Sequence, residues 1–416
     1  MQKTKITKCR FCGNKKIIPV INLGNQYLSS IFPKDLSYHK NIKKQPLNLV
    51  LCKKNKNSCG VLQLSHSFDM SEMYKQYPFT SSTNSSMPKI LKDVLDSTLF
   101  YVNLKENDLV LDIGGNDGTL LSYLKDTKCD LLCIDPAQNI KPIFTSKKFK
   151  TITNYFSEKV YKSATKKKAK IIFSIAMFYH LYNPIKFSKE IEACLSDNGI
   201  WVIQMAYLPK MIETTMYDNI VHEHVGYYGI DNIRWIMEKA GLEIFDVIVN
   251  DVYGGSFRLF IKKKGCSKYP KSKGYNKELK NEKKIKIYHP TTYKKFMEKI
   301  ERSREDLLSL CKKIKSEGKS VWIYGASTKG NTILQYCGIT KELIEAAADA
   351  NPFKSKKYMI GSDIPIKKET EMRFKKPDYL LALPYSFTNA FIKREAKLVK
   401  SGTKFIIPLP KVKIIK

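Results

Sequence analysis

The stretch YDNIVHEHVGYYGI at residues 217–230 holds the densest set of groups that could move a proton. It places two of the six histidines of the chain, His222 and His224, on either side of Glu223. Imidazole titrates near neutral pH and can act as an acid, a base or a metal ligand. The zinc site of H-E-x-x-H proteases is excluded because these two histidines lack its helical four-residue spacing. The pattern leaves proton-transfer chemistry and a polar corner of an ordinary fold as the two interpretations.

A second set of reactive groups is a pair of cysteine knuckles in the first sixty residues. Cys9 and Cys12 have the two-residue spacing typical of zinc sites, and each pair is followed by a glycine. Cys52 and Cys59 are separated by six residues, so a loop between them must bulge outward if both thiolates bind one ion. We expect a closed, structural zinc site with four thiolate ligands. The alternative is four buried or free cysteines.

A third set is a glycine turn between a predicted strand and a predicted helix, VLDIGGNDGTLL. The glycines allow the backbone to approach a ligand closely, and the acid at the strand end can face a cationic or hydroxylated group. Asp135 follows at the tip of the next predicted strand, where it can accept both hydroxyls of a ribose. The turn lacks G-x-G-x-x-G spacing, which favours S-adenosylmethionine over a dinucleotide. The predicted cofactor-binding residues here are Asp112, Gly114, Gly115, Asn116, Gly118, Asp135 and Pro136.

The elements that position these residues alternate between helix and strand from about residue 88, which indicates a doubly wound parallel sheet. Lysine-rich residues 264–290 are interpreted as an exposed connection, and 291–318 as an amphipathic helix. A second strand-turn-helix unit, KSVWIYGASTKGNTILQYC, starts a small C-terminal α/β domain. The predicted domains are residues 1–87, 88–263, 264–318 (the connection and its helix) and 319–416.

The formal charge of +34 raises the possibility of nucleic-acid binding. Only seven of the 73 basic residues are arginine, however, and the lysines are spread along the chain, which favours a solvated surface. No long apolar stretch and no signal-peptide pattern are present. We therefore expect a cytoplasmic protein that does not enter a membrane.

The motifs together resemble the sugar C-methyltransferase family, whose members act on nucleotide-linked 4-keto-deoxysugars. The matching pieces follow the family order: the cysteine pairs, YPFTSSTNSSM at 77–87, LDIGGNDGTLL, IDPA, HLYNP at 180–184, HEH, YGGSFRLFI at 253–261 and IYGASTKGNT at 323–332. The resemblance implies a zinc-binding N-terminal lobe, a central class I methyltransferase domain with a Rossmann-like sheet, and a C-terminal Rossmann-like domain that helps to hold the nucleotide sugar.

The resemblance also implies roles for the HEH residues. A hydrogen beside a ketone is acidic enough for a positioned imidazole to remove, and the enolate can then attack the methyl group of the donor. His224 matches the family's base, and Glu223 would orient or polarise the site with His222 beside it. His180 is predicted to contact the cofactor. The chain departs from the family pattern at Val221 and Phe79, where tyrosines are common.

Further positions are predicted to hold the acceptor. Tyr77, Ser81 and Tyr228 could replace the missing phenols, and Arg258 could bind a phosphate. Ser327 and Lys329 lie in a turn of small residues that resembles a phosphate-binding helix start, although an ordinary structural turn remains the alternative.

Methyl transfer from S-adenosylmethionine to a carbon of a nucleotide-linked keto sugar is the leading hypothesis from the sequence. The alternatives are an O-methyltransferase acting on a glycan or related metabolite, and a zinc-ribbon nucleic-acid-binding protein.

Overall fold

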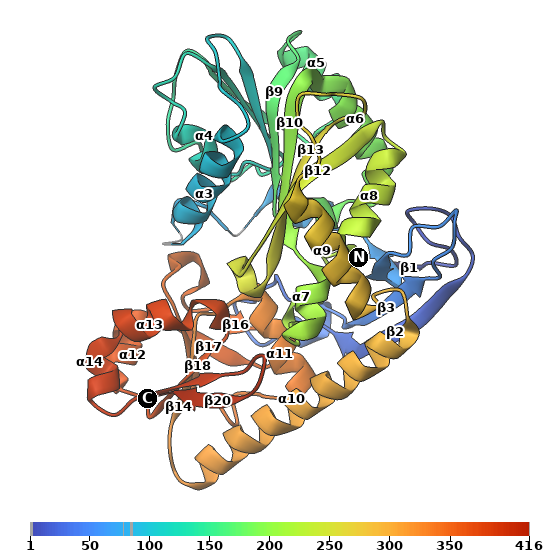
Figure 1. The fold of residues 1–416 in the computed structure, drawn as a ribbon. Coiled ribbons are helices and arrows are strands. Elements are labelled where there is room, and N and C mark those ends of the chain that lie inside the picture. The colour runs from blue at the N-terminus through green and yellow to red at the C-terminus, as the bar shows by residue number, and fades with distance from the viewer. Residues whose placement is uncertain (1–2, 78, 84–85, 416) are drawn as a thin grey trace.

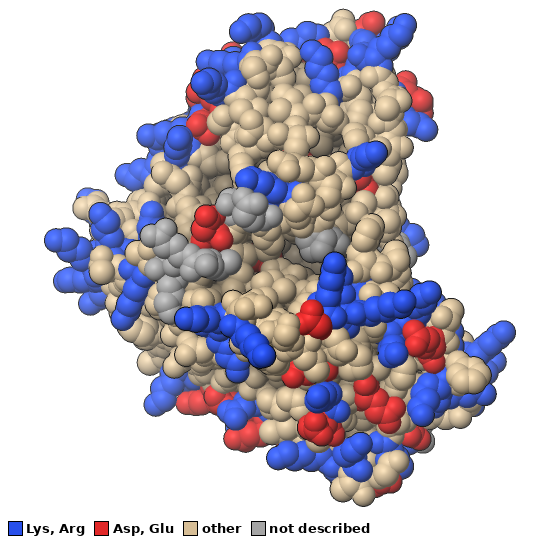
Figure 2. All heavy atoms as spheres, turned by 180° about the vertical axis from the view of Figure 1, so that it is seen from behind, with Lys and Arg blue, Asp and Glu red and all other residues tan. Residues whose placement is uncertain are grey.

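The computed structural model describes residues 3–77, 79–83 and 86–415 (Figure 1). It is an α/β protein in which an N-terminal lobe lies beside two α/β units, each built on its own seven-stranded sheet. Among the described helices, none combines the length and the apolar character needed to cross a membrane. Lysines and arginines are scattered over the face drawn in Figure 2 instead of forming one stripe, as expected for a solvated surface.

The N-terminal lobe contains a four-stranded antiparallel sheet with the order β11-β4-β3-β2. One of these strands, β11, comes from the HEH region far along the chain, because Gly226 pairs with Gln63 and Tyr227 with Leu62. The small strands β1 and β5 pair separately. The elements are β1 (Lys3–Lys5), β2 (Ile17–Gln26), α1 (Tyr38–Asn41), β3 (Gln45–Cys52), β4 (Leu62–Leu64), β5 (His66–Phe68), α2 (Ser71–Lys75) and β11 (Gly226–Tyr227).

The central sheet has the order β12-β13-β10-β9-β6-β7-β8 and confirms the predicted doubly wound arrangement. β8, β7, β6, β9 and β10 run parallel, and β13 is antiparallel to both of its neighbours. Its middle strands are largely apolar and buried, as expected for parallel strands that are covered on both faces. The strands are β6 (Leu109–Ile113), β7 (Asp130–Asp135), β8 (Phe149–Thr153), β9 (Ala169–Ile175), β10 (Leu195–Ala206), β12 (Leu242–Asn250) and β13 (Ser256–Lys263).

The helical elements of this unit are mostly short. They are α3 (Met87–Leu99), α4 (Thr119–Ser122), α5 (Glu158–Ala164), η1 (Phe178–His180), α6 (Pro184–Cys194), α7 (Leu208–Glu213), η2 (Tyr217–Asn219), α8 (Ile230–Glu238) and η3 (Val252–Gly254). Chain order reverses at β6, which lies between β7 and β9, so the carboxyl end of β6 is the position where doubly wound sheets bind ligands.

Residues 264–290 are not the exposed connection that the sequence predicted. They contain helix α9 (Lys273–Ile285), which begins when the Ser272 hydroxyl accepts a hydrogen bond from the Tyr275 amide. Tyr275 and Glu282 are buried, and the helix packs on β12. The prediction was wrong because the many lysines of this segment lie on the solvated face and mask a narrow buried stripe.

The C-terminal unit begins after helix α10 (Pro290–Ser316), the long orange helix of Figure 1. The residues predicted for its apolar stripe are buried except Leu310, which is half-buried; the buried ones are Phe296, Ile300, Leu307 and Ile314. The sheet has the order β16-β17-β15-β14-β18-β19-β20, with parallel strands from β17 to β19 and an antiparallel strand at each edge. The strands are β14 (Val321–Tyr324), β15 (Ala346–Asp349), β16 (Tyr358–Met359), β17 (Ile364–Lys368), β18 (Tyr379–Ala382), β19 (Lys404–Ile407) and β20 (Lys413–Ile415).

The helices of the C-terminal unit are α11 (Thr328–Cys337), η4 (Pro352–Lys354), α12 (Glu369–Lys375), η5 (Tyr385–Phe387), α13 (Thr388–Arg394) and α14 (Ala396–Lys400). Helix α11 packs against η2, just before the HEH residues, and η5 packs against η3. The central unit and the C-terminal unit therefore contact each other beside the segment that carries the candidate base.

Candidate active site

The glycine turn after β6 uses a left-handed backbone at alternate positions. Gly114, Asn116 and Gly118 have φ angles of 71°, 55° and 77°. Gly115 is required for a different reason, because a Cβ atom there would lie 2.7 Å from the Cys133 sulfur and 2.8 Å from a carboxylate oxygen of Asp112. The turn is therefore closely packed underneath while its backbone faces the open end of the sheet.

Asp135, at the end of β7, is fixed to this turn by both of its oxygens. Oδ2 accepts a hydrogen bond from the Asn116 amide at 2.9 Å, and Oδ1 accepts one from the Ala137 amide at 2.8 Å. Pro136 lies between Asp135 and Ala137 in the chain. These bonds hold the carboxylate at the carboxyl edge of the sheet, and each oxygen keeps a further lone pair for a ligand.

The segment after α2 crosses the turn. The Asn116 side chain donates to the Phe79 carbonyl at 3.0 Å and accepts from the Ser81 amide at 2.9 Å. The Ser82 amide donates to Asp117 at 2.9 Å. Ser81 and Phe79 thus bind the turn through their backbone groups. These hydrogen bonds connect the N-terminal lobe to the predicted donor site.

Asp112 is the buried acid of this site. Its side chain is 3% exposed, and within the described parts of the chain no hydrogen bond reaches its carboxyl group. Burial raises its pKa to about 8, and the nearby carboxylates of Asp135 and Asp117 add to the effect. A cationic ligand would relieve this cost, so Asp112 fits the ammonium group of S-adenosylmethionine.

His224 is held in one tautomer. Its Nδ1 lies 2.8 Å from the carbonyl oxygen of Asn219, which can only accept, so Nδ1 carries the proton and Nε2 has the lone pair. The side chain is 6% exposed and its ring centre lies 4.2 Å from that of Tyr179. Burial keeps its pKa well below the usual value, and the neighbouring His180 and Lys329 lower it further. His224 is thus a neutral imidazole with a free basic nitrogen.

His180 lies next to His224, with 5.4 Å between the ring centres. Its Nδ1 is 2.5 Å from the hydroxyl of Tyr74, and burial lowers its pKa to about 4. Tyr74 was not predicted from the sequence. It lies on α2, three residues before the predicted site residue Tyr77, and the two rings stack at 6.5 Å.

Tyr77 packs against Tyr74, and its hydroxyl is close enough to Glu223 and Asp135 for their charges to affect its pKa. Burial raises its pKa, and the carboxylates of Glu223 and Asp135 raise it further, in that order. Glu223 is half-buried, and its Oε1 is buried without a hydrogen-bond partner among the described residues. Burial also raises the pKa of Glu223. Tyr77, Glu223, His180 and His224 therefore form one group beside Asp135.

Other predicted site residues lie outside this group. The Nε2 atom of His222 is 3.3 Å from the Gln45 carbonyl, and its ring packs on Phe68, so it faces the N-terminal lobe. The Tyr228 ring packs between Phe11 and Phe178 and lines a small cavity with Tyr179 and His224. Neither residue faces the donor turn.

Arg258 and Ser327 are engaged within the fold. The Arg258 guanidinium is 1% exposed and donates to Gln204, to Ser97 and to the backbone and carboxylate of Asp93. It joins β13 and β10 to α3, which corrects the expectation that it reaches a phosphate. Ser327 caps α11 by accepting a hydrogen bond from the Gly330 amide at 3.0 Å.

The four cysteines form one cluster. The sulfurs of Cys9, Cys12, Cys52 and Cys59 all lie within 4.8 Å of one another, with Cys9–Cys59 at 3.5 Å and Cys12–Cys52 at 3.6 Å. Zinc–sulfur bonds of about 2.3 Å in a tetrahedron need sulfurs about 3.8 Å apart, so the cluster fits the ion. The side-chain amides of Gln63 and Asn14 donate to the Cys9 and Cys52 sulfurs, and such hydrogen bonds stabilise thiolates that bind a metal.

The long spacing of the second knuckle is closed by a loop, as predicted. The Ser58 hydroxyl donates to the Lys53 carbonyl and accepts from the Asn55 amide, each at 2.7 Å. Residues 55–57 are consequently pushed out to solvent.

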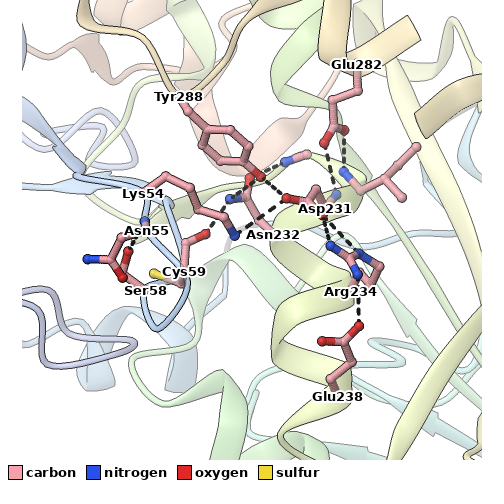
Figure 3. A network of polar contacts seen from close by, with 12 residues as sticks. Lys54, Asn55, Ser58, Cys59, Asp231, Asn232, Arg234, Glu238, Glu282 and Tyr288 are labelled. Atoms are coloured by element: carbon pink, nitrogen blue, oxygen red, sulfur yellow. Dashed lines mark hydrogen bonds and ion pairs between the residues drawn. The ribbon is translucent and has the colours of Figure 1, made fainter. Parts of the chain in front are cut away.

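This loop is connected to helix α8 of the central unit, which in turn is bound to α9 (Figure 3). Asn232, on α8, donates to the Cys59 carbonyl at 2.9 Å, and Lys54 pairs with Asp231 at 3.5 Å. Glu282, on α9, accepts hydrogen bonds from the Ile230 and Asp231 amides at the start of α8. The zinc lobe is therefore linked to the helix that follows the HEH segment.

Comparison with known proteins agrees with this arrangement. Residues 9–74 match a family model described as "Putative zinc binding domain", residues 84–247 match "Methyltransferase domain", and residues 251–410 match "C-methyltransferase C-terminal domain". The chain is thus a methyltransferase that depends on S-adenosylmethionine and carries an N-terminal zinc lobe.

A curated relative that aligns over nearly the whole chain is a C-methyltransferase. The chain is 26% identical to the C-methyltransferase NovU of Streptomyces niveus over 412 residues, which cover 99% of this chain and 97% of the relative. The resemblance to C-methyltransferases drawn from the sequence is confirmed.

Solved structures of other methyltransferases match the chain in part. The plantazolicin methyltransferase BamL, solved with a desmethyl analogue and SAH, covers 43% of this chain and 85% of its own, with 16% identity and a TM-score of 0.35. An S-adenosylmethionine-dependent methyltransferase of Clostridium acetobutylicum aligns with 42% of this chain over 92% of its own length, with 12% identity and a TM-score of 0.32.

Proposed function

We propose that the chain methylates a carbon atom next to the ketone of a nucleotide-linked 4-keto-deoxysugar, with His224 as the general base. The observation that carries the proposal is the His224 tautomer: Nδ1 is held by the Asn219 carbonyl, which leaves Nε2 as the basic atom beside His180 and Tyr179. When bound, the methyl donor supplies an electrophilic methyl group. His224 would remove the proton from the acceptor carbon and so make that carbon nucleophilic.

The neighbouring residues have roles that follow from their contacts. Tyr77 would donate to the acceptor, because its raised pKa keeps the phenol protonated. Glu223 would receive a hydroxyl or amino group of the sugar at its unpartnered oxygen. Asp112 and Asp135 would hold the ammonium and the ribose of the donor. The NovU name supports carbon as the acceptor atom. The match to a C-methyltransferase C-terminal domain supports a substrate site built like that of other C-methyltransferases.

A screen of nucleotide sugars with a methyl-labelled donor tests the proposal. Mass spectrometry of the products should find the label in a keto-deoxysugar, and fragmentation should place it on a ring carbon. Label on an oxygen would favour the O-methyltransferase alternative, and transfer to no keto sugar while other acceptors react would contradict the proposed substrate class.

Asp135→Ala should weaken S-adenosylmethionine binding by about tenfold to a few hundredfold, because charge-assisted hydrogen bonds are worth about 1.5–3 kcal/mol each. Isothermal titration calorimetry measures the change. Asp349→Ala is the matched control: Asp349, at the end of β15, also accepts two backbone amides, from Ala326 and Asn351, each at 2.8 Å. The control should bind the donor normally, and an unchanged affinity in Asp135→Ala would refute the assignment.

The affinity for S-adenosylmethionine should increase between about pH 6 and about pH 7.5, by up to about tenfold per pH unit. The sign follows from Asp112, whose pKa of about 8 leaves its carboxyl mostly protonated in this range, whereas a cationic ligand favours the ionised form. Binding should therefore release a proton, which calorimetry detects by comparing buffers of different ionisation enthalpy. Asp112→Asn should bind weakly with a flatter pH profile, and a pH-independent wild type would contradict this role.

A further inference from the structure

Lys329 does not occupy the position expected of a phosphate-binding lysine. The turn before α11 is capped internally by Ser327, and the Lys329 ammonium instead lies 5.9 Å from the centre of the Tyr253 ring. Its positive charge lowers the pKa of Asp218 and that of His224. Lys329 thus belongs to the C-terminal domain, and the packing of α11 on η2 brings it to the segment that leads into the candidate base.

The Lys329 ammonium has no hydrogen-bond or ion-pair partner among the residues that the structure describes, although it is half-buried. Burial lowers its pKa, and Asp218 partly offsets the effect. Asp218 is itself buried and accepts a hydrogen bond from the Tyr385 hydroxyl at 3.0 Å. A desolvated cation without a partner is costly unless a ligand supplies the missing acceptor.

The relative position of Lys329 and His224 is fixed by contacts between the two domains. The Thr332 hydroxyl, one turn after Lys329 on α11, donates to the Ile220 carbonyl at 3.2 Å. The Tyr217 hydroxyl lies 3.4 Å from the Cys337 sulfur at the end of the same helix. These bonds lie at both ends of residues 217–220, so α11 is attached directly to the segment that leads into HEH.

We propose that Lys329 is a further catalytic residue, which donates a hydrogen bond to the ketone oxygen of the acceptor while His224 removes the adjacent proton. The proposal rests on the proposed function. In this step the C–H bond breaks and its proton goes to Nε2 of His224. The C–H electron pair forms the new C=C bond, and the carbonyl π pair moves to the oxygen, where the Lys329 ammonium stabilises the negative charge.

Two features of this chain leave a place for a charged donor. The residue before HEH is Val221, a buried side chain that can donate nothing. The Tyr385 hydroxyl, which is near Asp218, already donates to that carboxylate. Lys329 would therefore add a charged donor to the neutral phenol of Tyr77, and a charge-assisted hydrogen bond to an enolate oxygen is stronger than a neutral one.

The test is exchange of the acceptor's α-hydrogen with deuterated water in the absence of donor. The probes are the thymidine and uridine diphosphate derivatives of 4-keto-6-deoxyglucose. Lys329→Met should lower the exchange rate by about 100-fold to 1,000-fold, the usual effect of removing one donor to a developing oxyanion. The control Lys341→Met removes an exposed lysine of the same domain and should exchange at the wild-type rate.

An NMR titration of His224 gives a second readout that needs no acceptor. Its imidazole pKa should rise in Lys329→Met, because a neighbouring positive charge is lost, and should stay low in Lys329→Arg and Lys341→Met. An unchanged pKa in Lys329→Met, or exchange within about threefold of wild type, would overturn the proposal. If wild type neither exchanges nor methylates either probe, the keto-sugar function fails and the role of Lys329 fails with it. An active wild type with an active Lys329→Met variant refutes only the role of Lys329.

Discussion

Replacing His224 by asparagine should reduce turnover by about 100-fold to 10,000-fold, the usual cost of losing a positioned general base. The Asn219 carbonyl now accepts from Nδ1 at 2.8 Å, and an asparagine amide could keep a similar hydrogen bond while providing no basic nitrogen. Donor binding and the melting temperature should therefore stay close to the wild-type values. Steady-state kinetics, calorimetry and thermal unfolding measure the three quantities.

The same variant should lose α-hydrogen exchange in deuterated water, which separates lost proton transfer from misplaced acceptor. The matched control is His222→Asn, since His222 belongs to the same motif but faces Gln45 and Phe68. Wild-type exchange in His224→Asn would show that another group takes the proton. In the wild type, the acid limb of the pH profile should lie below that of an ordinary histidine, because burial depresses the His224 pKa.

Removal of zinc should unfold the N-terminal lobe. Purified protein should contain about one zinc per chain, and the double variant Cys9→Ser, Cys52→Ser should contain almost none, because half of a tetrahedral thiolate site is lost. Structural zinc contributes folding free energy directly, so we expect rapid proteolysis within the first sixty residues and a markedly lower melting temperature. Elemental analysis and limited proteolysis followed by mass spectrometry are the measurements.

Cys266→Ser provides the control for the zinc experiment, since Cys266 is only half-buried and lies outside the cluster. It should keep both its zinc and its stability. A double variant with full zinc content would show that the four cysteines are not the ligands. Because the Cys59 carbonyl binds Asn232 on α8, loss of zinc should also lower methyl transfer through the helix that follows HEH.

The parts of the site that could be predicted from the sequence are those with local patterns. The turn from Asp112 to Gly118 is specified by backbone conformations that only a few residue types adopt, and the cysteine knuckles by ligand chemistry. The sheet order around β6 follows from alternating strands and helices. All three depend on residues that are near one another in the chain.

The remaining features arise from contacts between distant segments. Tyr74 reaches His180 across 106 positions, and Lys329 approaches His224 only because α11 packs on η2. Arg258 illustrates the opposite error. A rare arginine beside glycines suggested a phosphate site, but its partners Asp93 and Ser97 lie more than 160 positions away and have no recognisable spacing. Neither kind of contact could be predicted from the sequence, because the partners are far apart in the chain.

The pairing of β11 with β4 has a consequence for synthesis of the protein. The cysteine ligands precede β11 in the chain, so during synthesis the knuckles can take up metal before that strand has been made. The strand that completes their sheet, Gly226–Tyr227, emerges much later. Until then β4 exposes an unpaired edge, and another nascent chain could add to it. Fragments that end before residue 226 should therefore associate or precipitate even when supplied with zinc, and co-expression of the missing half should rescue them.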